Sequence, residues 1–274
     1  MIKLMNVTEI LSYIEKNLER KINMDTICNH TGYGCRYIQI IFKKHIGMTL
    51  WQYVKFRRVT RAALLLRLTS SKIIDISCRL QFDSQQSFNR EFKKIAGFTP
   101  LQYRKKNEWD LGPIFSPRSV DFQHPAPPEI FFVDNGFIYG SELSYEQERM
   151  ETNKPFSLRW KRIDKYLIED SSPLYLLSQF HIGKSNNDSI KVKTIIGRPD
   201  NTKIHKCKLY KYNAGQYVRL LHSGSKEEYI NSVSYLYLVV LPYYGLKRKD
   251  GYDIELISKD NCGYKCELLV PVVV

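Results

Sequence analysis

Hydrophobic residues recur at helical spacing through the first hundred residues of the chain. The spacing predicts two helices, at about 35–46 and 84–95, each with one apolar stripe and one polar face. The stripes consist of Ile38, Ile41, Phe42 and Ile46 in the first helix, and of Phe88, Phe92 and Ile95 in the second. A shorter helix is expected before each of them, so this part of the chain is predicted to be all helical.

The end of each longer helix lies in a repeated segment. Residues 42–53 read FKKHIGMTLWQY and residues 92–103 read FKKIAGFTPLQY, with seven of twelve positions identical. This match predicts two copies of one supersecondary unit, each a short helix, a tight turn and a longer helix. Gly32 supplies a positive φ for the first turn, and Thr49 caps a long helix that joins the two copies.

The pattern changes after a Pro-rich stretch at 108–128, which is expected to be a linker or a connector draped over the surface. Short apolar stretches then alternate with two segments of helical spacing. The predicted strands are 130–133, 137–140, 174–180, 192–196, 207–212, 216–221, 252–257 and 265–273, and the predicted helices are 145–168 and 226–239. This order describes an α+β fold built from a duplicated β-α-β-β unit.

Length and charge both favour two domains in this chain of 274 residues. Residues 1–107 carry 20 Lys and Arg against 7 Asp and Glu, a net charge of +13, whereas residues 108–274 carry 22 against 21, a net charge of +1. The predicted domains are therefore 1–107 and 129–274, with 108–128 between them. The excess of positive charge favours a polyanion such as double-stranded DNA as partner. A domain that is merely basic is the alternative.

The N-terminal residues do not read as a signal peptide, because Lys3, Glu9 and Lys16 interrupt the apolar positions. The chain is therefore expected to stay in the cytoplasm. No apolar stretch reaches the roughly 18–20 residues that span a bilayer, so no membrane association is predicted. The six cysteines are scattered and are expected to be reduced thiols. Neither a cofactor nor a metal site is predicted.

The polar faces of the two longer helices carry residue types suited to DNA. Arg can bond guanine through two nitrogens, and Gln or Asn can do the same to adenine, so residues near the start of each helix are candidates for base contacts. These candidates are Arg36, Gln39 and Ile40 in the first helix, and Gln85, Gln86, Ser87, Asn89 and Arg90 in the second. The candidates for phosphate contacts are Lys43, Lys44, Thr49, Arg57, Lys93, Lys94 and Arg104. A solvated polar face without a partner is the alternative interpretation.

Residues from about 5 to 104 resemble the DNA-binding domain of AraC/XylS-type regulators, in the MarA/SoxS/Rob branch. The resemblance is carried by residues 27–42, by Arg57-Arg58 in the joining helix, and by residues 76–103 with Phe82-Asp83-Ser84-Gln85-Gln86-Ser87-Phe88. The second half is similar to GyrI-like effector-binding domains. The resemblance implies a multidomain transcription activator that binds successive major-groove segments as a monomer and recruits RNA polymerase at stress or multidrug-resistance genes.

Four positions depart from the pattern of that family. Arg36 and Ile40 stand where the branch has Trp and Arg, so the first unit is expected to have an altered DNA preference. Gln81 stands where many members have Gly, which leaves the geometry of the second turn open. Gly34 replaces a Ser that would cap the first of the two longer helices.

One predicted strand carries the candidate effector site. Strand alternation places Tyr252, Ile254 and Leu256 on one face, and Asp253 and Glu255 on the other. An acidic residue among tyrosines suits an organic cation, and by resemblance Glu255 takes the place of the pocket carboxylate. A strand Glu that faces the solvent is the alternative. Further candidates are Trp160, Tyr175, Tyr217, Tyr235 and Tyr237, for which core packing is the alternative. The expected effector is a small hydrophobic or cationic molecule.

We expect no enzymatic activity. Two other hypotheses about function remain open. The second domain could be a small-molecule hydrolase, or the protein could be an architectural DNA-binding protein that regulates nothing. A hydrolase would need a second acid or base beside Glu255, and the sequence identifies none.

Overall fold

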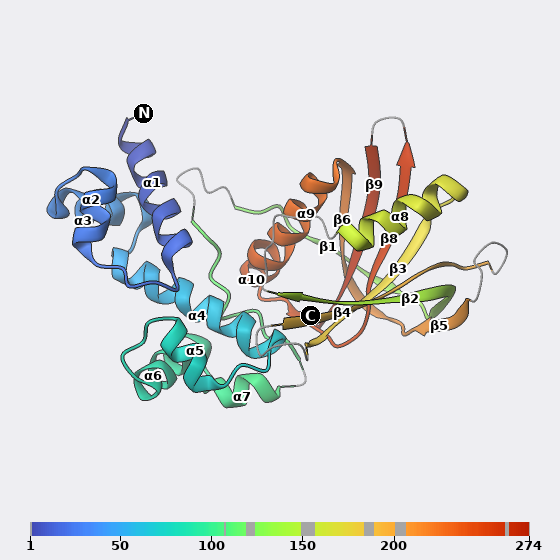
Figure 1. Cartoon of the computed structure of the whole chain (residues 1–274), viewed down its shortest axis with the longest axis horizontal. Coiled ribbons are helices and arrows are strands. Elements are labelled where there is room, and N and C mark those ends of the chain that lie inside the picture. Colours follow the sequence, from blue (N-terminus) through green and yellow to red (C-terminus); the bar gives the residue numbers. More distant parts are fainter. Residues whose placement is uncertain are drawn as a thin grey trace. The chain divides into compact units, whose positions relative to one another are not determined.

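The computed structural model describes residues 2–106, 108–118, 124–148, 157–183, 189–200, 207–260 and 263–273. The chain divides into two compact units. The first is helical and consists of Met1–Arg67, Ser71–Lys105 and Gly112–Pro125; the second combines helices and strands and consists of Leu68–Ser70, Lys106–Leu111 and Ala126–Val274 (Figure 1). Among the residues described, every helix is too short or too polar to span a bilayer.

The helical unit contains two helix-turn-helix pairs joined by one long helix, as the repeat predicted (Figure 1). In chain order its helices are α1 (Ile2–Asn17), α2 (Met24–Thr31), α3 (Cys35–Ile46), α4 (Leu50–Leu68), α5 (Ile73–Arg79), α6 (Gln85–Ala96) and α7 (Pro100–Lys105). The pairs are α2 with α3 and α5 with α6. The Thr49 hydroxyl accepts a hydrogen bond from the backbone N–H of Gln52 at 3.2 Å, which confirms the predicted cap of α4.

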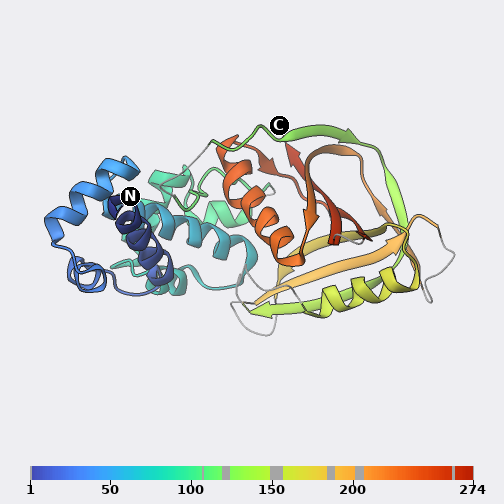
Figure 2. The same ribbon diagram turned by 90° about the horizontal axis from the view of Figure 1, so that it is seen from above.

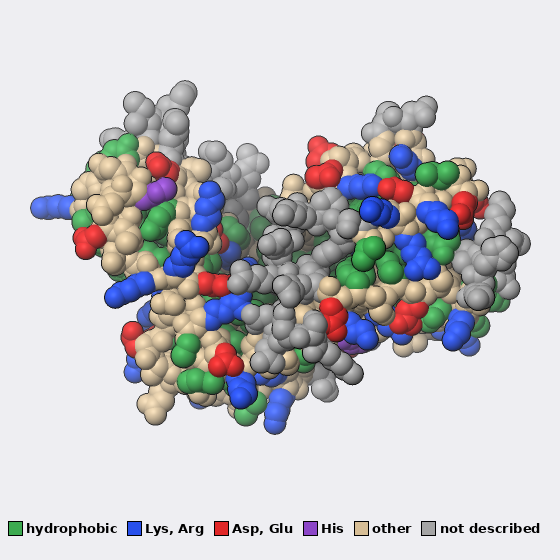
Figure 3. Space-filling view, viewed as in Figure 1, with side chains coloured by type: hydrophobic (Ala, Val, Ile, Leu, Met, Phe, Trp, Pro, Cys, Tyr) green, Lys and Arg blue, Asp and Glu red, His purple; other side chains and the backbone are tan. Residues whose placement is uncertain are grey.

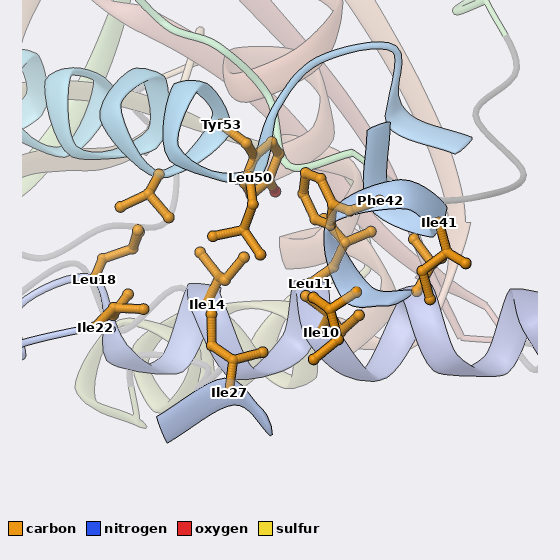
Figure 4. Close-up of a cluster of buried hydrophobic side chains, with 13 residues drawn as sticks. Ile10, Leu11, Ile14, Leu18, Ile22, Ile27, Ile41, Phe42, Leu50 and Tyr53 are labelled. Carbon is orange, nitrogen blue, oxygen red and sulfur yellow. The ribbon is translucent and has the colours of Figure 1, made fainter. Parts of the chain in front are cut away.

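The first four helices share one hydrophobic core (Figure 4). Ile14 of α1, Ile27 of α2, Phe42 of α3 and Tyr53 of α4 are all fully buried within it. The apolar stripe predicted for α3 is thus the face that packs inward. Because α3 is amphipathic, burying this stripe turns its polar face to the solvent.

The second turn adopts the geometry of a glycine turn without a glycine. Gln81 has a φ of 58°, close to the 72° of Gly32 in the first turn, and is the one non-glycine residue with positive φ in the part of the chain that is described. This backbone costs a residue with a Cβ about 1–2 kcal/mol. Gln81 Nε2 donates to Glu19 O at 3.3 Å, and Gln81 O accepts from Arg58 Nη1 at 3.4 Å. These contacts hold the residue in place, so the departure from glycine leaves the turn intact.

The described residues of the Pro-rich stretch pack against other parts of the chain. Phe115 stacks on Phe56 with 5.2 Å between ring centroids, and its backbone N–H donates to Thr60 Oγ1 at 2.8 Å. Trp109 instead forms a β-bridge with Arg248 of the second unit. The sequence left a linker and a connector draped over the surface as alternatives. These contacts favour the draped connector.

The second unit is built on one nine-stranded sheet, in which every pairing is antiparallel. Its strands are β1 (Glu129–Val133), β2 (Gly136–Glu148), β3 (Leu174–Ile182), β4 (Ser189–Arg198), β5 (Lys208–Tyr212), β6 (Gly215–Gly224), β7 (Lys247–Arg248), β8 (Asp253–Asp260) and β9 (Gly263–Val273). The spatial order is β1-β6-β9-β8-β3-β4-β2-β5, with β7 beside β9. The helices are α8 (Ser157–Glu169), α9 (Lys226–Tyr235), a π-helical turn η1 (Leu236–Val240) and α10 (Leu241–Tyr243).

The order of elements confirms the duplicated β-α-β-β pattern, as β2-α8-β3-β4 followed by β6-α9-β8-β9. The predicted helix at 145–168 begins too early, because β2 continues to Glu148 and Tyr145 pairs with Val192 of β4. Residues 149–156 of that predicted helix lie outside the described residues. Strand β1 pairs with β6, and the start of β2 pairs with β5. The chain bends between these two pairings, as the curving ribbon in Figure 2 shows.

Each face of the sheet has its own hydrophobic cluster. On one face, Ile163 of α8 and Tyr229 of α9 pack with strand residues such as Leu176. The other face buries Ile254 and Tyr217 among further tyrosines. Both helices therefore cover the same face. Because side chains alternate along a strand, every second residue of a strand lies beneath the helices.

Candidate nucleic-acid interface and small-molecule unit

The polar face of α3 is open to solvent. Arg36 and Gln39 are exposed near its start, and Ile40 is 58% exposed. Lys43 and Lys44, one turn later, are also exposed. The residues suited to base edges and those suited to phosphates thus lie on one accessible surface. Because Ile40 has no hydrogen-bonding group, it can offer a base only an apolar contact, such as one to a thymine methyl.

The polar face of α6 repeats this arrangement. Gln86 is exposed and the Arg90 side chain is 78% exposed, with exposed Lys93 and Lys94 one turn further. Gln85 is half-buried. The most accessible candidates for base contacts on α6 are therefore Gln86 and Arg90.

Two other candidates on α6 are partly engaged by the protein itself. The Ser87 hydroxyl donates to Ser84 O at 3.0 Å and accepts from Ser84 N at 3.3 Å, while Ser84 Oγ accepts from Ser87 N at 3.1 Å. This reciprocal capping box secures the start of α6. Asn89 is half-buried and its Oδ1 is inaccessible to solvent. Ser87 therefore has a structural role, and Asn89 presents less of its amide than its neighbours do.

The start of α3 lacks such a cap. Its N-cap residue is Gly34, which makes no side-chain hydrogen bond to the helix. This is the consequence predicted from the replacement of Ser by Gly at that position. The first unit thus holds the start of its longer helix, α3, less firmly than the second unit holds the start of α6.

Two arginines predicted to contact phosphates instead hold the fold together. Arg57 is 9% exposed, and its Nε and Nη2 donate to the Glu15 carboxylate at 2.8 and 2.9 Å. Arg104 donates to Leu66 O at 3.1 Å and to Ser71 O at 2.6 Å. A guanidinium offers five donors, and Arg57 and Arg104 direct at least three and two of theirs, respectively, to groups within the helical unit. We therefore remove both from the set of phosphate contacts.

The exposed Lys and Arg side chains give the helical unit a basic surface. Figure 3 shows them projecting from the outline of this unit, on the left of the view. Thr49 is exposed at the start of α4, but its hydroxyl also contacts Gln52 Oε1 at 3.0 Å. Lysines rather than Arg57 and Arg104 therefore supply the cations available to a phosphate backbone.

Glu255 of the second unit lies on the helix-covered face of the sheet, buried at 4% exposure. Arg159 Nη2 of α8 donates to Glu255 Oε1 at 2.5 Å, and Tyr229 Oη of α9 donates to Oε2 at 2.7 Å. The carboxylate thus joins both helices to β8. Glu255 was predicted to hold a cationic ligand, with a solvent-facing strand Glu as the alternative. Its burial is contrary to that alternative, and Arg159 already balances its charge.

The pKa values of neighbouring groups reflect this buried charge. Burial, together with the negative charge of Glu255, raises the pKa of Tyr229 far above its usual range and that of Cys266 to about 12. Burial alone would lower the pKa of Arg159, but the adjacent carboxylate outweighs it and raises the pKa. Arg159 therefore stays charged and Tyr229 stays protonated at neutral pH, so Tyr229 is a donor and not a base.

The other candidates for the effector site do not gather around Glu255. Trp160 is buried on the same face, and its ring lies 5.2 Å from the Lys226 ammonium, which also binds Asp164 at 2.6 Å. Tyr175 and Tyr217 belong to the cluster on the opposite face. Tyr235 is 48% exposed at the end of α9. These residues therefore do not line one cavity.

Sequence reasoning missed the partners of the buried carboxylates. Arg159, Tyr229 and Arg248 were not singled out. Tyr237 was a candidate for the effector site, but with Arg248 it bonds the buried Asp253. The alternation along β8 correctly put Asp253 and Glu255 on one face. Their partners come from α8, α9, η1 and β7, from five to 96 residues away in the chain, and no helical or strand spacing marks them.

A shallow cavity of about 570 Å³ lies over β6, β8 and β9 of the second unit. Its apolar lining includes Leu221, Leu256 and Pro173, and Lys265 and Glu267 add charges. An apolar floor with charged margins suits an amphipathic small molecule.

Two protein-family models match the chain. A helix-turn-helix domain matches residues 27–106, and a GyrI-like small molecule binding domain matches residues 142–273.

Relatives match across both units. The F1 operon positive regulatory protein of Yersinia pestis is 32% identical over 99% of this chain and 89% of its own length. The putative HTH-type transcriptional regulator YkgA of Escherichia coli strain K12 is 33% identical over 72% of this chain and 83% of its own length. The right origin-binding protein of the same strain is 28% identical over 97% of each chain. The chain belongs to the AraC-type transcription regulators that join a double helix-turn-helix DNA-binding domain to a GyrI-like domain.

Proposed function

We propose that this protein is a monomeric, sequence-specific transcription activator that reads DNA through α3 and α6 and recruits RNA polymerase. The observation that supports the proposal is the pair of exposed polar faces on these two helices, which lie in one compact unit and are joined along the chain by α4. A single chain thereby holds two base-contacting helices, and a second chain is not needed to supply either.

The length of α4 supports binding on one side of the duplex. Its 19 residues correspond to about 28 Å at 1.5 Å per residue. One turn of B-DNA advances by about 34 Å, so helices carried near the two ends of α4 suit successive major-groove segments. The name of the Yersinia pestis relative, a positive regulatory protein, favours activation over repression. The resemblance to the MarA/SoxS/Rob branch favours stress or multidrug-resistance genes as targets.

The test of DNA recognition is selection of binding sites from random duplexes. We expect an enriched site with two conserved segments whose centres lie about 10 base pairs apart, one for each helix-turn-helix unit. Affinity for that site should fall with salt, with a slope of log affinity against log salt near −0.9 for each phosphate neutralised. Recovery of no enriched sequence would contradict specific recognition. An enriched site that drives no reporter transcription would favour the architectural alternative.

We further propose that a small amphipathic molecule bound by the GyrI-like unit modulates this activity. The cavity over β6, β8 and β9 supports the proposal, whereas the closed Glu255–Arg159 pair argues against a bare cation at Glu255.

Thermal unfolding in the presence of hydrophobic cations, bile-salt-like anions and fatty acids tests for the effector. A ligand at about 100 times its Kd should raise the unfolding midpoint by about 5–10 °C, because it binds only the native state. Leu221→Glu, in the cavity, should abolish the shift. Leu209→Glu, at a similarly exposed leucine on β5, should preserve it. Equal shifts in both variants would place the ligand elsewhere.

A further inference from the structure

Two thiols meet at the turn of the first helix-turn-helix unit. Cys28 on α2 and Cys35, the first residue of α3, are both free, and their Sγ atoms lie 2.7 Å apart. Of the five cysteines that the structure describes, these two are the pair in contact. A disulfide joins its sulfurs at about 2.05 Å, so bond formation requires the two atoms to approach by only about 0.7 Å.

The two thiols differ in accessibility. Cys35 is exposed and Cys28 is half-buried, so a dissolved oxidant reaches Cys35 first. The hydrogen bond between them, together with burial, raises the pKa of the Cys28 thiol to about 11. Cys28 therefore keeps its proton at neutral pH until Cys35 has reacted, which makes Cys28 the resolving thiol.

The location of the pair matters because the start of α3 is weakly held. Gly34 provides no side-chain cap, and the turn also contains Gly32 with its positive φ. The second unit instead secures α6 with the Ser84–Ser87 capping box. A covalent bond from α2 to Cys35 would fix the very residue at which α3 begins.

We propose that Cys28 and Cys35 form a reversible dithiol–disulfide site that clamps α2 to α3. The Cys35 thiolate attacks a small disulfide such as oxidised glutathione, forming a mixed disulfide and releasing one glutathione thiolate. Cys28 then loses its proton and attacks the Cys35 sulfur, which expels the second glutathione. Two protein thiols are oxidised to one disulfide, and one glutathione disulfide is reduced to two thiols.

The consequence for DNA rests on the proposed function. Arg36, a candidate for base contacts, directly follows Cys35. A clamped α3 loses less conformational freedom on binding, so the oxidised protein should bind the selected site about two- to five-fold more tightly.

The test treats the full chain with oxidised glutathione, alkylates the remaining thiols and digests the protein with trypsin. Cleavage after Lys21 and Arg36 releases residues 22–36, which carry both cysteines. We expect this peptide to be lighter by two hydrogen atoms and unalkylated, and to take up two alkyl groups after reduction. The unfolding midpoint of the helical unit should rise by about 5–10 °C on oxidation.

Matched variants assign these effects. Cys28→Ser and Cys35→Ser should each remove both the mass change and the thermal shift. Cys78→Ser, at an exposed cysteine on α5, should preserve both. A persistent glutathione adduct on Cys35, or disulfides between chains, would overturn the proposal. A disulfide that leaves DNA affinity unchanged would overturn the clamp. The mass measurement needs no DNA, so a failure of the proposed function would leave it interpretable.

Discussion

Replacement of both Gln86 and Arg90 by Ala is expected to weaken binding to the selected DNA site by at least about 30-fold, since each bidentate base contact contributes about 1–3 kcal/mol. Both side chains are exposed on α6, so the helix should fold as before. Affinity for random DNA should fall much less, because one positive charge is lost. Titration of both DNAs by fluorescence anisotropy measures the two effects.

Charge and base recognition can be separated with two controls. Lys93→Ala, one turn along α6, should weaken specific and random binding alike and reduce the salt slope by about one phosphate. Lys16→Ala removes the same charge from an exposed position on α1 and should change little. If the Gln86/Arg90 variant lost specific and random binding in equal proportion, α6 would be a phosphate-binding helix and not a base-reading one.

Arg159→Met is expected to lower the free energy of unfolding of the GyrI-like unit by about 3–5 kcal/mol, because it leaves the Glu255 carboxylate buried without its counter-ion. The Tyr229 hydroxyl remains as a donor to Glu255 but carries no charge. Chemical denaturation followed by circular dichroism at neutral pH measures the loss.

A double variant shows whether the unpaired charge is the cause. Combining Arg159→Met with Glu255→Leu should restore most of the lost stability, because neither charge then remains buried. Arg162→Met, at a half-buried arginine one turn along α8, should have a much smaller effect, since within the described part of the chain Arg162 makes a long hydrogen bond of 3.5 Å to Ser141 Oγ and no ion pair. A double variant as unstable as Arg159→Met would assign the loss to packing by the arginine stem.

The helical unit could be predicted in detail because its pattern is local. The spacing of Ile38, Ile41 and Phe42 identified the face of α3 that packs inward, and so identified the exposed face as well. The turn at Gln81 was harder to predict. Nothing near it in sequence shows that Glu19 and Arg58 hold the left-handed backbone.

The candidate contacts were predicted with mixed success for the same reason. Residue type suggested a phosphate role for Arg57 as readily as for Lys43, yet Arg57 pairs with Glu15, 42 residues away. Glu255 was placed on the correct face of β8, but its neutralisation by Arg159 was not foreseen. The cysteine pair was missed because the six residues between Cys28 and Cys35 cross a turn, and spacing alone does not bring two sulfurs together.

Periodicity, repetition and charge along the chain were thus sufficient for the two helix-turn-helix units, the duplicated α+β unit and a polyanionic partner. These properties depend on backbone geometry and on neighbours a few positions apart along the chain, and that spacing is visible in the sequence itself. Pairing of buried charges and contact between thiols depend on residues that only folding brings together. The energies of these contacts are set by burial and by distances of a few ångströms. The contacts of Arg57, Glu255 and the Cys28–Cys35 pair could therefore be identified only from the folded structure.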